Sequence, residues 1–173
     1  MTSMDQFAVG LPDAAGLSRG SGGGGSLQRM LVPVGAPGGS AAALAIAARA
    51  CAALNGALRV VHVRIFDPPV RSCSRFYPES SAQATAVIEQ ALTGVWPLGI
   101  KASGVVIDAE RPLLAKAVAA AARDWGAGVI VLTRRPRPAV ARLLLGSVAD
   151  QVMRHATCPV LVVRPEDASH VSR

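Results

Sequence analysis

The stretch Leu143-Leu-Leu-Gly-Ser-Val-Ala-Asp-Gln-Val-Met-Arg-His-Ala-Thr-Cys-Pro-Val-Leu-Val-Val-Arg164 joins a Gly-Ser turn, a helix and an apolar strand. It predicts a helix from about Val148 to Ala156 and a strand from Val160 to Val163. Ser147-Val-Ala-Asp150 is typical of a capping box, in which a serine hydroxyl accepts from a helix amide and an acid reaches back. Capping alone would explain Ser147, and Gly146 would then only turn the chain into the helix.

The same order of strand and helix is repeated upstream of this stretch. Strand, helix, strand order implies right-handed parallel crossovers. We therefore expect one α/β domain, in which a five-stranded, mainly parallel sheet carries helices on both faces. The upstream strands are Met30 to Val34, Leu58 to Val63, Val105 to Ile107 and Val129 to Leu132; the helices run from the N-cap Ser40 to Asn55-Gly56, from Ser80 or Ser81 to about Val95, and from Pro112 to Trp125, before Gly126.

The two ends of the chain differ from this domain in composition. Residues 1–28 contain Gly20-Ser-Gly-Gly-Gly-Gly-Ser26 and little that could nucleate a core, so we expect a flexible tail there. The domain is expected over 29–165, and a C-terminal tail over 166–173. Within the first strand, Pro33 fits only where its missing amide would face an unpaired site or the strand end.

Composition indicates a single globular domain. The 173 residues are 51% hydrophobic and only 3% aromatic, so Ala, Val, Leu and Ile must build the core. The N-terminus lacks the pattern of a signal peptide, and prolines and glycines interrupt the longest charge-free runs, which argues against a membrane span. The cysteines form no CxxC pair and are expected to be reduced in a cytoplasmic protein: Cys51, Cys73 and Cys158.

Basic residues exceed acidic ones by 18 to 11, a net charge of +7 that permits contact with phosphates, nucleic acid or anionic lipid. Four arginines lie in one short segment without an acid, Arg134-Arg-Pro-Arg137 and Arg142. Guanidinium groups bind phosphates through paired hydrogen bonds, so an anion could dock there, and a solvated basic loop without a ligand is the competing interpretation. Few aromatic residues and no recognisable motif argue against nucleic-acid binding.

No set of residues for catalysis or metal binding emerges from the sequence. His62 lies in a predicted strand, His155 in the last turn of the final helix and His170 in the tail, so each is expected to be structural or exposed. The acid pair Asp108 and Glu110 follows a predicted strand and is expected to be solvated. We therefore expect a protein without catalysis and without a metal.

The Leu-Leu-Gly-Ser-Val turn and the Cys-Pro-Val-Leu-Val-Val end resemble the C-terminal signature of the universal stress protein family. The similarity extends over roughly residues 29–165. It implies the strand order 3-2-1-4-5 for the five predicted strands. Ligands of open parallel sheets bind where the connection order reverses, so the crevice would lie between Gly35-Ala36 and Thr133-Arg134.

ATP-binding members of that family carry an Asp after the first strand and a Gly-x2-Gly-x9-Gly-Ser/Thr pattern that cradles the phosphates. Counting back from Gly146-Ser147, the earlier glycine positions fall on Thr133 and Pro136, and the Asp position falls on Gly35. Proline lacks the amide and the freedom of a glycine, so only the final Gly-Ser is retained. The resemblance therefore implies a degraded ATP-binding motif.

The resemblance also implies a small regulatory stress-response protein that acts as a homodimer, with weak or no ATP binding and an unknown regulatory partner. Pairing through the last strand would cover an apolar edge formed by Val160, Leu161, Val162 and Val163. The alternative is a nucleotide-binding protein for ATP or another adenine nucleotide, with phosphates at the arginine segment and the helix start, and a base near Val63. The candidate nucleotide or anion site then comprises Gly35, Ala36, Val63, Thr133, Arg134, Arg135, Arg137, Gly146, Ser147 and Val148.

Overall fold

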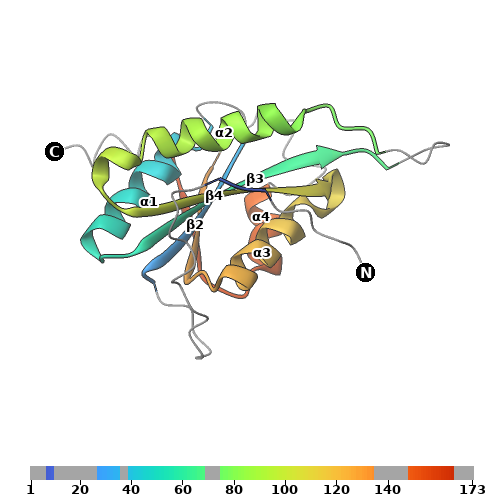
Figure 1. Ribbon diagram of the computed structural model, residues 1–173. Coiled ribbons are helices and arrows are strands. Elements are labelled where there is room, and N and C mark those ends of the chain that lie inside the picture. The colour runs from blue at the N-terminus through green and yellow to red at the C-terminus, as the bar shows by residue number, and fades with distance from the viewer. Residues whose placement is uncertain (1–6, 10–26, 36–38, 69–74, 135–147, 166–173) are drawn as a thin grey trace.

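The computed structural model describes residues 7–9, 27–35, 39–68, 75–134 and 148–165 (Figure 1). In this part of the chain, six strands form one sheet in the order β1-β4-β3-β2-β5-β6. All neighbouring strands from β4 to β6 are parallel. The strands are β1 (Phe7–Val9), β2 (Arg29–Val34), β3 (Ala57–Phe66), β4 (Lys101–Glu110), β5 (Val129–Thr133) and β6 (Val160–Val163).

Helices cover both faces of the sheet, as Figure 1 shows. One buried cluster joins α1 and α2 to the sheet, and a second joins α3 and α4 to the opposite face. Five strands in the predicted order 3-2-1-4-5 and helices on both faces confirm the expected fold class. The helical elements are α1 (Ala41–Ala53), α2 (Ser81–Thr93), η2 (Trp96–Leu98), η3 (Arg111–Leu113), α3 (Leu114–Trp125) and α4 (Val148–His155).

Alternating residues of the central strands divide the core between these two faces. Val32 and Val60 belong to the cluster under α1 and α2, whereas Leu31 and Val61 belong to the cluster under α3 and α4. All four are fully buried. Both faces of a parallel sheet are covered, and its strands therefore appear in the sequence as unbroken apolar runs.

Two strands are longer than the sequence predicted, and one was not predicted. β3 and β4 pair over their full lengths, from Ala57 opposite Lys101 to Phe66 opposite Glu110. Within the segment 1–28, for which a flexible tail was expected, β1 pairs antiparallel with β4. The sheet therefore gains a sixth, antiparallel strand at its β4 edge.

Two helix ends carry the capping features that the sequence predicts, whereas α3 begins at Leu114 rather than at Pro112, which lies in η3. Ser80 caps α2 in a capping box with Gln83, and Gly126 closes α3 in the left-handed conformation. Ser40 occupies the N-cap position of α1, as predicted, but its side chain makes no capping hydrogen bond. Across the described ranges, no helix is long and apolar enough to span a lipid bilayer.

Candidate functional site

The candidate site lies at the ends of β2 and β5, where the order of the strand connections reverses. From the central strand β2, the chain continues to β3 on one side and later to β5 on the other. The β2–β3 ladder reaches Val34, but the β2–β5 ladder comprises only Met30 and Leu31. Pro33, which has no amide hydrogen, therefore lies beyond the last β2–β5 pair, in agreement with its expected place at an unpaired site.

Thr133, the last residue of β5, contacts the start of α1 at this point. Its hydroxyl oxygen accepts a hydrogen bond from the backbone N–H of Ala43, at 3.2 Å. Ala43 is fully buried in the first turn of α1, where amides have no partner within the helix. Thr133 thus replaces the side-chain cap that Ser40 does not supply, and it links the end of β5 to the helix that follows Gly35.

Half of the predicted site residues can be placed. Gly35 directly follows β2, and Val63 is half-buried on the α3 side of the sheet. The backbone N–H of Arg134 donates to the Val163 carbonyl at 2.7 Å, while the residue itself is exposed. Val148 is the exposed first residue of α4. The predicted site residues outside the described ranges are Ala36, Arg135, Arg137, Gly146 and Ser147.

A mostly apolar groove of about 460 Å³ adjoins Val34 and Gly35 and extends between α1 and α2. Leu44 and Val87 contribute to its apolar lining, and Arg49 to its polar part. The end of β2 therefore borders open space on the side of the sheet that α1 and α2 cover.

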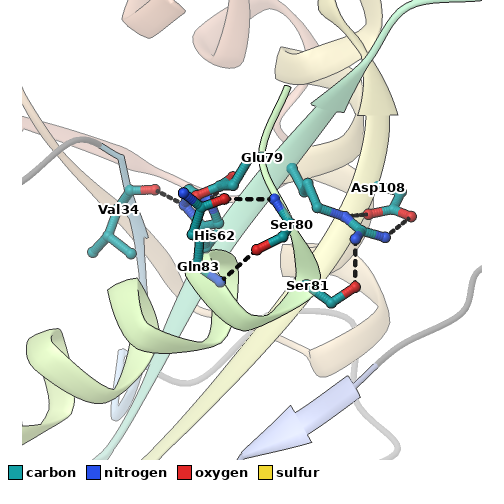
Figure 2. A network of polar contacts seen from close by, with 8 residues as sticks. Val34, His62, Glu79, Ser80, Ser81, Gln83 and Asp108 are labelled. Carbon is teal, nitrogen blue, oxygen red and sulfur yellow. Dashed lines mark hydrogen bonds and ion pairs between the residues drawn. The ribbon is translucent and has the colours of Figure 1, made fainter. Parts of the chain in front are cut away.

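His62 joins the end of β2 to Glu79, two residues before α2, and the sequence did not reveal these contacts (Figure 2). The ring is buried, with Nδ1 3.0 Å from the Val34 carbonyl oxygen and Nε2 2.7 Å from Glu79 Oε2. Because a carbonyl can only accept, Nδ1 carries a proton, and the contact with Glu79 needs a second proton on the ring or on the carboxyl group. Both ring nitrogens are therefore engaged, and of the two expectations for His62, structural or exposed, its burial and contacts favour the structural one.

A second polar cluster ties the extended ends of β3 and β4 to α2 (Figure 2). Arg64 donates to both carboxylate oxygens of Asp108, at 2.8 and 2.7 Å, and to the Ser81 hydroxyl. Tyr77 also donates to Asp108, at 2.9 Å. Burial raises the pKa of Asp108, but hydrogen bonds from Arg64 and Tyr77 and the charges of Arg64 and Arg75 lower it by more, so the pKa falls below its ordinary 3.8. Asp108 is thus bonded rather than merely solvated, which corrects the expectation for this acid.

The possible metal ligands and the cysteines are two further groups of side chains that bear on the chemistry of the site. Among the residues that the structure describes, no three His, Cys, Asp or Glu side chains gather to hold a metal ion. Cys51 is buried and Cys158 partly buried, and neither is in a disulfide. Burial raises the pKa of Cys51 to about 11, which disfavours the nucleophilic thiolate.

Comparisons with known proteins agree on one family. The family model described as "Universal stress protein family" matches residues 26–164. A universal stress protein of Synechocystis sp. is 42% identical over 43 residues, 25% of this chain and 28% of that protein. The matched stretch spans 28% of the length of the first curated relatives as well.

Solved structures share the fold at low sequence identity. A universal stress protein in complex with cAMP has a TM-score of 0.62 and 20% identity, covering 80% of this chain and 98% of that chain. A universal stress protein from Archaeoglobus fulgidus in complex with dAMP has a TM-score of 0.58 and 19% identity, covering 78% and 95%. At these identities the likeness establishes the fold alone.

Proposed function

The chain belongs to the universal stress protein family, and from this premise we propose that it is a small regulatory stress-response protein without catalysis and with weak or no ATP binding. We further propose that it is cytoplasmic and acts as a homodimer. The residues at the crevice, rather than the fold, carry the proposal on ATP, because one fold can serve many functions.

The hydrogen bond between Thr133 and the Ala43 amide is the observation on which the weak ATP binding rests. By the family pattern, position 133 corresponds to the first glycine of the phosphate loop, where close backbone approach is needed. Here that position carries a side chain whose hydroxyl is engaged with α1. Gly35, at the position of the ribose-binding Asp, offers no charged acceptor.

Calorimetric titration with ATP tests this proposal. We expect no saturable heat from the wild-type protein. The double variant Gly35→Asp, Thr133→Gly restores two family positions and should bind ATP more tightly than wild type, provided that its circular dichroism spectrum remains native. Saturable micromolar binding by the wild-type protein would contradict the proposal.

The homodimer that we propose would form by pairing of β6 with the same strand of a second copy. β6 is the last strand of the described sheet, and Leu161 at its centre is 45% exposed. An apolar strand at an edge invites association with another chain. Leu161→Asp should therefore yield monomer or insoluble protein, and an unchanged dimer mass in light scattering would reject this contact.

Nucleotide binding through the arginine segment is the second candidate function. The structures in complex with cAMP and dAMP favour it, because they show that proteins of this fold bind adenine nucleotides. Arg134 is exposed directly after β5, and its guanidinium is a suitable phosphate donor. Micromolar binding of ATP or a cyclic nucleotide that Arg134→Ala and Arg137→Ala abolish would favour this function over the first.

A further inference from the structure

Two arginines share one tryptophan at the end of the sheet opposite the crevice. Arg29 is the first residue of β2, and Arg59 lies near the start of β3, two register steps beyond the residue that pairs with Arg29. Their guanidinium carbons lie 5.8 Å and 4.8 Å from the ring centroid of Trp125, the last residue of α3. Trp125 is buried, so the two side chains converge on a fixed surface.

The positive charge of this pair is poorly balanced. Arg29 donates to the Trp125 carbonyl oxygen at 3.0 Å, and the Arg59 Nε donates to the Ser103 hydroxyl at 3.3 Å. Among the described residues, no carboxylate forms an ion pair with either guanidinium. Burial, followed by the charge of Arg29, lowers the pKa of Arg59. A half-buried charge in this setting is costly, and an anion would relieve the cost.

The end of α3 offsets only part of this charge. A helix C-terminus is equivalent to roughly half a negative charge, and Arg29 already takes its terminal carbonyl. Each guanidinium group has five N–H donors, and the hydrogen bonds to Trp125 and Ser103 use one donor of Arg29 and one of Arg59. Donors from both arginines therefore remain for an oxyanion that lies between them.

We infer that Arg29, Arg59 and Ser103 form a site for a phosphate-like oxyanion, in which the Trp125 ring holds the two guanidinium groups in place. A doubly charged oxyanion matches two cations, and its several oxygens match the fork of each guanidinium. The guanidinium groups occupy the indole face, so recognition would concern the anion and not an aromatic ring. The site is separate from the crevice, because it lies at the beginning of the strands rather than at their ends.

Tryptophan fluorescence gives a local readout for this site. In a Trp96→Phe variant Trp125 is the sole tryptophan. Inorganic phosphate, titrated at constant ionic strength against chloride, should change its emission with saturation and raise the melting temperature. O-phosphoserine in a parallel titration distinguishes a phosphomonoester from free phosphate, since only the former places a carbon substituent beside the anion.

Matched variants decide whether the arginine pair binds the anion. Arg59→Gln should weaken binding roughly tenfold or more, because it removes charge-assisted hydrogen bonds. Arg111→Gln, the same charge change at an exposed residue on the other end of the sheet, should leave binding intact. If Arg59→Gln does not fold, Arg59→Lys takes its place. Lysine retains the positive charge but lacks the planar guanidinium group, so this variant should bind the anion several-fold more weakly than wild type. Unsaturable responses, or equal responses in wild type, Arg59→Gln and Arg59→Lys, would overturn the inference.

Discussion

Replacing Thr133 by valine should destabilise the protein through a single hydrogen bond. Valine keeps the size and β-branching of threonine but removes the hydroxyl that accepts from the Ala43 amide. Because Ala43 is fully buried and Ser40 supplies no side-chain cap, the amide would be left without an acceptor. Leaving a buried donor unsatisfied costs about 1–3 kcal/mol, so the free energy of unfolding should fall by that amount. Urea denaturation followed by circular dichroism measures it, with an unchanged m-value.

Thr133→Ser is the matched control, since it retains the hydroxyl and loses only a methyl group at a half-buried position. Its free energy of unfolding should stay closer to wild type than that of the valine variant. Amide hydrogen exchange gives an independent readout, because the Ala43 N–H should lose protection in the valine variant alone. Equal stabilities of the valine variant and wild type, or an equal loss in the serine variant, would refute the reasoning about this amide.

Three further outcomes test the packing, a thiol and an ion pair. Gly104→Ala should cost about 1–3 kcal/mol because its Cβ would collide with Ile88, whereas Gly94→Ala, with its nearest neighbour at 3.8 Å, should show no such loss in urea denaturation. Cys51 should resist thiol reagents at about pH 8, since its pKa is raised, so Cys51→Ser should not change the number of thiols labelled in the native protein. The pKa of Asp108 is depressed when folded, so its stabilising effect is present above pH 3.8 and disappears as the pH falls below it. Asp108→Asn should flatten acid denaturation in that range, and an unchanged acid transition would show that the carboxylate contributes little.

Most of the fold could be predicted because its signals are local. A buried parallel strand is an apolar run, and a helix end shows its capping residues, so the five strands followed from the sequence. Their order came from the resemblance to the universal stress protein family. The outer halves of β3 and β4 could not be predicted, because their polar residues, such as Arg64 and Asp108, are stable in the sheet only through each other. β1 was missed for a related reason, since its three residues form a strand only against β4.

The position of the candidate site stays a prediction, and the contacts around it could not be predicted from the sequence. The reversal of strand order placed Gly35 and Thr133 at the crevice. The bond from Ala43 to Thr133 joins segments 90 residues apart, and the sequence instead suggested Ser40 as the cap. His62 was expected to be structural or exposed, but its partners come from β2 and from the segment before α2, and no local pattern identifies them.

The caps of α1 and α2 determine what kind of anion site this end of the sheet can offer. Thr133 takes a first-turn amide of α1, and Ser80 takes one of α2, so oxygens of the protein already occupy donors that a phosphate would use at a helix start. Each cap takes one amide, and exposed guanidinium groups such as that of Arg134 then become an important source of anion affinity in the candidate site. Exposed cations are screened by salt more strongly than a closed cradle of backbone amides. Any nucleotide binding at the crevice should therefore weaken steeply with ionic strength, and salt-independent binding would show that backbone amides form the site after all.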